Sequence, residues 1–296
     1  MPSPSRAILA LPVLGLFLAA ATAKPGIAQP VADRRADQVA THTWVIHGPA
    51  GLPNKANLGF INNPSFVVSA KSVIVVDPGS SAETGKMVVR TIRKITEKPV
   101  THVFVTHIHG DHWLANQAIA DAFPQARFFA HAKMIEQAKN GEAKSWLNLL
   151  NRMTEGAIGG TQVLIPTEAV GNGASVQVDD IELRILASDH AHTRTDIMIE
   201  VVQDAVMFLG DNVVNQRMGR MDDGSFRGNI EACERARTSG ARIFVPGHGP
   251  TGDADSTLGF CDYLVALYEA VGDLIEEGLE DFEMNPLLEP RFERYA

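Results

Sequence analysis

Short runs of β-branched and aromatic residues recur along the chain, each bounded by turn-forming residues such as Gly, Pro or Asn, and this pattern predicts strands. The predicted strands are Thr43–His47, Phe60–Val68, Ser72–Asp77, His102–Thr106, Arg127–Ala130, Ala174–Val178, Ile181–Leu186, Ile197–Val202, Ala205–Leu209 and Arg242–Val245. Between them, apolar residues three and four positions apart predict helices. The predicted helices are Ser81–Lys94, Trp113–Phe123, Lys133–Met153 (which Gly141 can break), Asn229–Thr238 and Leu258–Ile275.

Strands and helices alternate in both halves of the chain, which is typical of an α/β or α+β fold. Central sheets with helices outside them are the simplest layered arrangement of such elements. No linker rich in Ser or Pro divides the chain, so we expect one domain over residues 41–296, preceded by a polar, flexible lead-in over residues 24–40.

Residues 1–23 have the pattern of a signal peptide. An apolar run from Ala7 to Ala21 follows Arg6, and Ala21-Thr22-Ala23 has the small residues of a cleavage site. The run is short for a membrane span. We therefore expect cleavage near Lys24 and a periplasmic or secreted protein without stable membrane insertion, with an uncleaved anchor as the alternative.

The composition and net charge of the chain indicate which kinds of molecule it can bind. Hydrophobic residues make up 45% of the 296 residues and charged residues 21%, as in ordinary folded proteins. The chain has 26 Lys and Arg against 35 Asp and Glu, a net charge of −9, and no block of consecutive basic residues. Such a chain is poorly suited to nucleic acid, so we expect a small-molecule substrate instead.

The two cysteines, Cys233 and Cys261, fall on two separate predicted helices. Two cysteines cannot form a disulfide scaffold or a four-cysteine zinc site. An exported protein could pair them. Because the sequence does not show whether their Cα atoms come close enough, we favour buried free thiols.

Four potential metal ligands follow the predicted strand His102–Thr106, in the pattern His107-x-His109-x-Asp111-His112. In an extended chain, His107 and His109 point to the same side. Imidazole and carboxylate groups suit zinc and similar divalent ions. Four such residues in six positions behind a buried strand favour a metal site over a solvated turn.

This motif resembles that of the metallo-β-lactamase superfamily, and further stations of the family pattern follow in order. They are Asp77 before Pro78-Gly79, His192 in His192-Thr193-Arg194-Thr195-Asp196, Asp211 in Leu209-Gly210-Asp211-Asn212, and His248 in Pro246-Gly247-His248-Gly249-Pro250. The resemblance runs from about Thr43 to Tyr268. It implies a four-layer αβ/βα sandwich with the metal site along one edge of the sheets.

The resemblance also implies two Zn²⁺ ions per chain. By carry-over of the family's ligands, one ion is held by His107, His109 and His192, the other by Asp111, His112 and His248, and Asp211 bridges them. Two close cations lower the pKa of a shared water, so a metal-bridging hydroxide can attack a carbonyl-type substrate. We therefore predict an exported dinuclear zinc hydrolase in which Asp111 and Asp211 take part in catalysis.

The third station departs from the usual family pattern. Ala191 stands where a Gly is usual, and Arg194-Thr195 replaces a Pro-Gly after the Thr. His190 is an alternative to His192 as ligand, but only His192 begins the His-Thr-x-x-Asp motif. Asp77 and Asp196 are expected to support the ligands through hydrogen bonds rather than to bind metal themselves.

The substrate is not settled by the family, whose members act on several bond types. Glyoxalase-II-like thioesterases share the ligand set, but the segment Glu269–Ala296 has nine acidic residues against two arginines and would repel anionic glutathione. Exported β-lactamases of the family usually carry Cys or Ser at the Asp211 position. The chain looks similar to exported zinc hydrolases associated with periplasmic quinoprotein or sulfur-oxidation systems.

We expect hydrolysis of an ester, thioester, lactone or amide. Three alternatives remain: hydrolysis of lactam antibiotics, iron-dependent oxygenation of sulfur compounds, and a non-catalytic secreted zinc-binding protein. Apolar residues from three segments are predicted to form the wall of the substrate pocket. They are Phe60, Trp146, Met218, Met221 and Phe226. Around Trp146, the apolar spacing suits plain core packing of a helix equally well.

Overall fold

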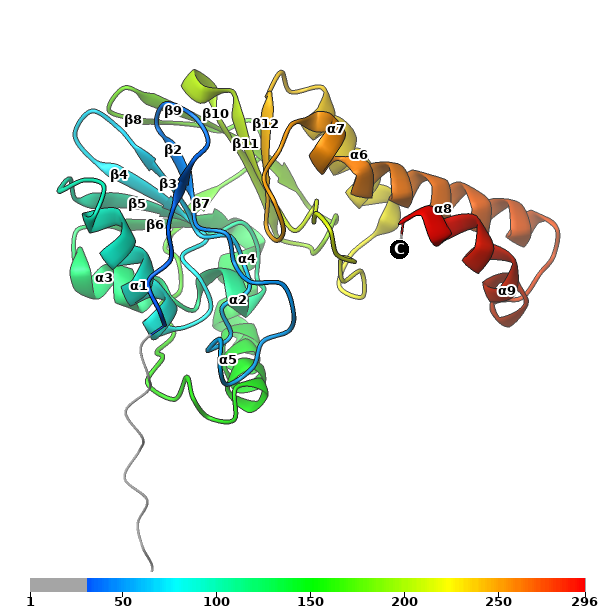
Figure 1. Ribbon diagram of the computed structural model, residues 1–296, viewed down its shortest axis with the longest axis horizontal. Helices are drawn as coiled ribbons and strands as arrows, with labels where there is room; N and C mark the ends of the chain where they lie inside the picture. The colour runs from blue at the N-terminus through cyan, green and yellow to red at the C-terminus, as the bar shows by residue number, and fades with distance from the viewer. Residues whose placement is uncertain (1–30, 296) are drawn as a thin grey trace, which may run out of the picture.

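A computed structural model describes residues 31–295, in which two β-sheets lie between outer layers of helices (Figure 1). The first sheet has the strand order β1-β2-β3-β4-β5-β6-β7. Its strands are β1 (Asp37–Gln38), β2 (Thr43–Val45), β3 (Ser65–Val68), β4 (Val73–Val76), β5 (Val100–Phe104), β6 (Arg127–His131) and β7 (Glu168–Val170). Neighbours from β1 to β4 are antiparallel, and neighbours from β4 to β7 are parallel. The carboxyl ends of β4, β5 and β6 therefore meet at one edge.

The second sheet has the order β12-β11-β10-β9-β8. Its strands are β8 (Ser175–Val178), β9 (Ile181–Ser188), β10 (Asp196–Val201), β11 (Val206–Gly210) and β12 (Ile243–Pro246). Only the pair of β11 and β12 is parallel. This arrangement brings the ends of β11 and β12 to the same side of the molecule, where loops can contribute to one site.

Helices cover the outer faces of the sheets. They are α1 (Ala82–Arg93), α2 (Gly110–Trp113), α3 (Asn116–Ala122), α4 (Ala132–Gln137), α5 (Ala143–Met153), α6 (Phe226–Arg237), α7 (Ala254–Thr257), α8 (Gly259–Glu276) and α9 (Asp281–Phe292). Ser81 and Ser225 begin α1 and α6, each with its side chain accepting a backbone N–H of the first turn, as N-cap residues do.

The apolar core is divided as this layering requires. Phe104 and Val76 of the first sheet pack with Ile185 and Phe208 of the second in a core between the sheets. On the outer face of the first sheet, a separate cluster joins its strands to α1 and α3. Another joins the second sheet to α6 and α8. The predicted four-layer α/β sandwich is therefore confirmed.

Several boundaries differ from the predictions. The strand predicted from Phe60 begins only at Ser65, and the Asn62 and Asn63 side chains before it donate to Asp77 O and Pro246 O at the ends of β4 and β12. The helix predicted over Trp113–Phe123 is two short helices, α2 and α3. The break at Gly141 is present, since this glycine has a φ of 119° between α4 and α5.

The expectation of free thiols is wrong, because Cys233 and Cys261 form a disulfide. Helices α6 and α8 pack beside each other on the second sheet, and this packing brings the two Cα atoms to 5.8 Å. That separation is within the range that a disulfide spans. The packing of the two helices therefore determines that the cysteines pair, which their separation in the sequence did not show.

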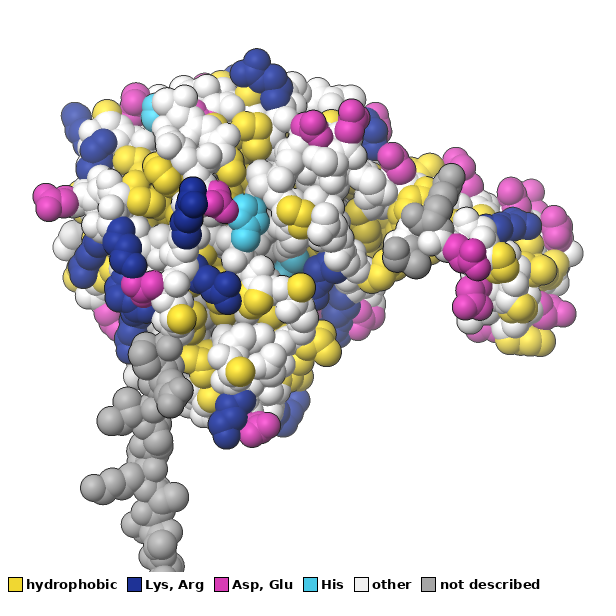
Figure 2. All heavy atoms as spheres, viewed as in Figure 1, with side chains coloured by type: hydrophobic (Ala, Val, Ile, Leu, Met, Phe, Trp, Pro, Cys, Tyr) yellow, Lys and Arg dark blue, Asp and Glu magenta, His cyan; other side chains and the backbone are white. Residues whose placement is uncertain are grey.

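Helices α8 and α9 extend from the body as an arm (Figure 1), with acidic and apolar side chains along it (Figure 2). Helix α9 contains Pro286 and Pro290 and was not predicted. At the other end, the chain from Val31 contacts α1: Asp33 pairs with Arg90 and Lys94, and β1 extends the sheet. The predicted signal peptide lies outside the described residues. Within residues 31–295, no helix combines the length and apolar character that a membrane crossing needs.

Candidate metal centre

The seven predicted metal ligands lie together in two adjacent groups of buried side chains. The first group is His107, His109, His192 and Asp211, and the second is Asp111, His112 and His248. Within each group, one potential ligand atom from every residue lies within 4.8 Å of the others. His190, the alternative to His192, is exposed and lies outside both groups.

Strand ends position these side chains at the seam between the two sheets. His107 and His109 follow β5, and Asp111 and His112 lie in α2. The second sheet contributes one ligand before β10, one after β11 and one after β12. A hydrogen bond from Ile197 N to Thr106 O, 2.8 Å long, joins the two sheets beside the site. The alternation of strands and loops therefore places distant residues around one small volume.

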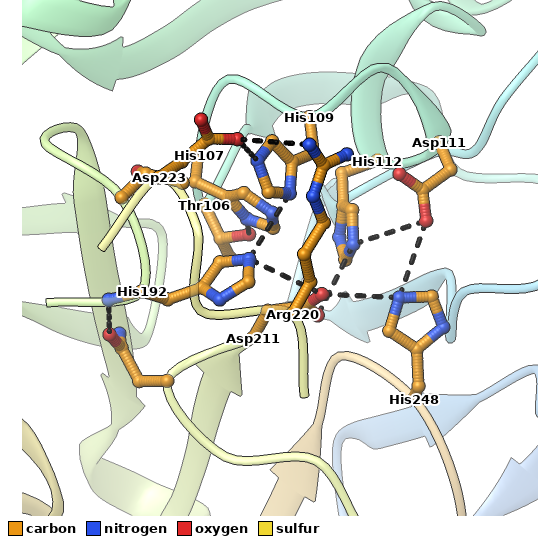
Figure 3. A network of polar contacts seen from close by, with 12 residues as sticks. Thr106, His107, His109, Asp111, His112, His192, Asp211, Arg220, Asp223 and His248 are labelled. Atoms are coloured by element: carbon orange, nitrogen blue, oxygen red, sulfur yellow. Dashed lines mark hydrogen bonds and ion pairs between the residues drawn. The ribbon is translucent and has the colours of Figure 1, made fainter. Parts of the chain in front are cut away.

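Asp211 lies at the centre of the cluster (Figure 3). Its carboxylate oxygens are 3.3 Å from His112 Nε2, 3.3 Å from His248 Nε2 and 3.6 Å from His192 Nε2. His112 and His248 belong to the second group and His192 to the first. One carboxylate thus contacts histidines of both groups.

Several buried polar atoms in the cluster lack hydrogen-bond partners. Among the described residues, His107 Nε2 is such an atom, and His112 Nε2 and Asp211 Oδ1 face each other at 3.3 Å without the geometry of a hydrogen bond. In addition, His109 Nδ1 and His192 Nε2 face each other at 3.1 Å. Buried polar atoms are normally paired, and nitrogen and oxygen lone pairs that converge on one point are what a divalent cation satisfies. The donor set therefore fits metal ions.

The electrostatics differ between the two groups. Burial, helped by the nearby His112 and His109, lowers the pKa of His107 well below 6.5. Burial also lowers the pKa of His192 to about 3, although Asp211 opposes this. Burial acts against protonation of His248 too, but Asp211 and Asp111 outweigh it and raise its pKa to about 9. A cation entering the second group would therefore displace a proton from its ligand.

Asp77 lies beneath the cluster and accepts three hydrogen bonds. They come from Thr106 N (2.8 Å), Thr106 Oγ1 (2.7 Å) and His112 Nδ1 (2.8 Å). The last bond turns the His112 ring so that Nε2 faces Asp211. Asp77 lies outside both groups, and these contacts support its predicted role in orienting a ligand.

Asp196 holds the loop that carries His192. It accepts hydrogen bonds from Thr193 N at 2.7 Å and from Thr193 Oγ1 at 3.0 Å. Burial raises the pKa of Asp196 to about 6. The carboxyl group thus fixes the backbone one residue after the histidine, which supports the role predicted for it.

Sequence analysis missed several residues that contact the candidate ligands, among them Asn212 and Asp223. Asn212 Oδ1 accepts the His192 N–H at 3.4 Å, and the Asn212 carbonyl accepts from the Asn229 side chain. Asp223 Oδ2 accepts from His109 Nε2 at 3.1 Å (Figure 3). Asn212 could have been found because it adjoins Asp211. Asp223 has no such signal, since the loop that carries it folds back onto the site only in three dimensions.

A cavity of about 730 Å³ adjoins the cluster. Trp146 of α5 lines it and packs against the His109 ring, with ring centroids 4.6 Å apart. Ile108 and Leu149 add apolar surface, and His190 and Arg194 lie on the opposite wall. Of the five predicted pocket residues, only Trp146 lines this cavity.

The other four predicted pocket residues lie elsewhere. Phe60 is 1% exposed and lies in the loop before β3, where it belongs to the core cluster between the first sheet and α1. Phe226 begins α6 and lines a cavity against α8. Met218 is exposed and lines two other cavities, and Met221 is only partly buried and does not line this one. The residues of segment 216–226 that line the cavity are therefore Arg220, Asp222, Asp223 and Gly224, and none of its large apolar residues.

Comparisons with known proteins agree with this geometry. The sequence profile of the Metallo-beta-lactamase superfamily matches residues 58–248. A probable metallo-hydrolase of Streptococcus pyogenes is 22% identical over 202 residues, which cover 64% of this chain and 79% of that protein.

Solved structures of similar fold include metallo-β-lactamases. The enzyme from Pontibacter korlensis aligns with a TM-score of 0.61 at 15% identity, over 78% of this chain and 99% of its own. The enzyme from Hirschia baltica aligns with a TM-score of 0.57 at 16% identity, over 79% of this chain and 98% of its own. At such low identity, the likeness concerns the fold alone.

Proposed function

The chain belongs to the metallo-beta-lactamase superfamily and is a metal-dependent hydrolase, and we propose that it is an exported enzyme with two zinc ions that hydrolyses an ester, thioester, lactone or amide. The central position of Asp211, in contact with histidines of both ligand groups, carries this proposal. A carboxylate between two groups of nitrogen ligands is suited to hold two cations close together.

Two bound cations would supply a water of lowered pKa as nucleophile and would polarise the carbonyl of the substrate. His107, His109 and His192 would hold one cation, and Asp111, His112 and His248 the other. The buried His107 Nε2 atom, which has no hydrogen-bond partner among the described residues, and the convergence of His112 Nε2 on Asp211 Oδ1 support this assignment.

Asp111 remains ionised in this setting. Burial opposes its charge, but His112 and His248 outweigh that effect and keep its pKa below the usual value. Its Oδ2 atom lies 3.3 Å from His248 Nε2. An ionised carboxylate at this edge can orient a water by accepting a hydrogen bond from it. Trp146, packed on His109, shields the site from bulk water on one side.

Export is supported by two independent features. Residues 1–23 have the charge, apolar run and small-residue site of a signal peptide. The disulfide between Cys233 and Cys261 is of the kind that persists in oxidising compartments. Amino-terminal sequencing of protein from the periplasm should begin near Lys24, whereas an intact Met1 on a cytoplasmic product would contradict export.

Metal content and turnover, measured on the same preparation, test the hydrolase proposal. After mild dialysis, elemental analysis should find close to two metal ions per chain, mainly zinc. A panel of ester, thioester, lactone and lactam reporters should show hydrolysis that a chelator abolishes and zinc restores. One metal per chain with iron dominant would favour the oxygenase alternative. Preference for lactams would favour a β-lactamase, and full metal content without turnover would favour a binding protein.

A further inference from the structure

We propose that Arg152 and Arg194 form a binding site for an anionic group in the cavity beside the metal centre. The substrate would then be an acyl compound that carries a second, negatively charged group such as a carboxylate, phosphate or sulfate. This inference rests on the proposed hydrolase function, since it concerns which substrate that centre receives.

The two arginines reach the same cavity from two different elements of the fold. Arg152 lies on α5, and Arg194 lies in the loop between His192 and β10. Both side chains are exposed. Neither guanidinium forms a hydrogen bond or ion pair with another described residue. Each guanidinium is therefore free to bind a ligand.

The other charged residues that line the cavity are one arginine, Arg220, and three acidic residues, Glu142, Asp222 and Asp223. Arg220 bonds to Asp222 with Nε 2.7 Å from Oδ1, and its Nη2 atom lies 3.9 Å from Asp223. Asp223 in turn accepts from His109. Glu142 immediately precedes α5, ten residues before Arg152, which corresponds to roughly 15 Å along a helix axis. Arg220 is thus held by acidic neighbours, whereas no acidic group among the described residues pairs with Arg152 or Arg194.

The backbone that carries Arg194 is held firmly. Thr193 Oγ1 and Thr195 Oγ1 lie 2.9 Å apart, and Thr195 Oγ1 also accepts from Ile108 N at 3.1 Å. The Thr193 hydroxyl group also donates to the Asp196 carboxylate. The residues on both sides of Arg194 are therefore fixed, although its own side chain is exposed. A fixed backbone reduces the entropy lost when the guanidinium binds an anion.

The proposed anionic site gives a reason why the motif that begins at His192 differs from the usual family motif. This arginine stands in place of the proline that is usual after His-Thr in the resembling family. A proline there would carry no charge and no hydrogen-bond donor. The anionic site is therefore a property of this chain rather than of the common metal-binding pattern.

The position of Arg152 relates the anionic group to the reacting carbonyl. Trp146 contacts His109 at the metal end of α5, and Arg152 lies six residues further, roughly 9 Å along the helix. Leu149 lines the cavity between them. The geometry suits a substrate whose carbonyl and charged group are separated by a short apolar segment.

The net charge of −9 does not prevent such binding. Repulsion from distant acidic groups is screened beyond about 10 Å at 0.1 M salt. A guanidinium can form two parallel, charge-assisted hydrogen bonds with a carboxylate or phosphate. The local pair of arginines therefore determines which ligand the cavity accepts.

Matched reporters test the site on the metal-loaded, full-length protein. We would compare a thioester whose acyl chain ends in a carboxylate with the same compound as its neutral methyl ester. The double variant Arg152→Gln/Arg194→Gln should raise KM for the charged reporter roughly tenfold, since exposed charge pairs are modest in strength. KM for the neutral reporter and kcat for both should stay unchanged. A phosphorylated reporter shows which anion the site prefers.

Arg242 offers a matched control, because it is an exposed arginine outside the cavity. Arg242→Gln should leave both reporters unaffected. An equal change in KM for charged and neutral reporters, or no change at all, would overturn the proposed site.

Direct binding separates this inference from the proposed hydrolase function. If the wild-type protein hydrolyses no reporter, the hydrolase proposal fails, but the anionic site can still be judged. Calorimetry with the ketone analogue of the carboxylate reporter, in which a methylene group replaces the thioester sulfur and leaves no bond to hydrolyse, should then show binding to the wild type and at least roughly tenfold weaker binding to the double variant. Equal affinity for the two proteins would refute the anionic site regardless of activity.

Discussion

At the scale of single residues, Asp211 is the side chain on which the metal centre depends most. Changing Asp211 to Ala removes the carboxylate that lies within 3.6 Å of histidines from both groups. We expect metal content to fall and turnover to drop by roughly a hundredfold or more, because the nucleophile depends on the metal pair. Asp211→Cys should retain more metal than Asp211→Ala, since a thiolate is a good zinc ligand.

Asp121 on α3 provides the control for this experiment, because it is an exposed aspartate far from the cluster in the fold. Asp121→Ala should keep wild-type metal content and rate. If Asp211 served only as a turn residue after β11, the Ala variant would behave like this control. Circular dichroism should show that both variants keep their secondary structure, because the core between the sheets does not include Asp211.

At the scale of elements, a disulfide joins α6, which covers the second sheet, to α8, the first helix of the arm. The two cysteines are 28 residues apart. Closing a loop of this size stabilises a protein by about 3–4 kcal/mol when the effect comes from the entropy of the unfolded chain. The Cys233→Ser/Cys261→Ser variant should therefore unfold at lower urea concentration than the wild type, in non-reducing buffer.

Metal content serves as the control measurement for the Cys233→Ser/Cys261→Ser variant. Cys233 Sγ lies 3.9 Å from the Asn212 carbonyl, but neither cysteine belongs to the ligand groups. Zinc stoichiometry should therefore survive the substitution. Wild-type protein in strong reductant should reproduce the loss of stability. Two reactive thiols per denatured, unreduced chain would show instead that the bond does not form.

At the scale of the whole molecule, His102 is expected to contribute to the pH dependence of stability. Its half-buried ring stacks on Phe129 at the open edge of the inter-sheet core. Burial, together with the charge of Arg127, lowers the pKa of His102. The unfolded state therefore binds a proton more readily than the folded state once the pH falls below about 6.5. Stability should decrease as the pH falls through this window.

The variant His102→Gln tests this expectation, because glutamine does not titrate. Urea unfolding at pH 7 and pH 5 should show a smaller loss of stability in the variant than in the wild type. The lost ring contact lowers the variant's stability at both pH values, so it cancels from the comparison. Equal losses on acidification would mean that His102 does not contribute.

The sequence by itself determined the layered fold and the set of candidate ligands. Strands with strong β-branched runs, such as Val73–Val76, were found because burial on both faces leaves a continuous apolar pattern. The ligands were found because each belongs to a short motif at a strand end, and the structure brings all seven into two groups. Such signals are local, so they can be read without knowing which segments meet.

Only the tertiary structure decided which residues pair and which line the cavity. Cys233 and Cys261 join because α6 and α8 pack side by side. Phe60 was expected in the pocket but lies in the core, and Asp223 reaches His109 from 114 positions away. Arg152 on α5 and Arg194 in the loop before β10 share one cavity although separate elements carry them. These contacts depend on how distant segments pack against each other, and no local pattern of residues records that packing.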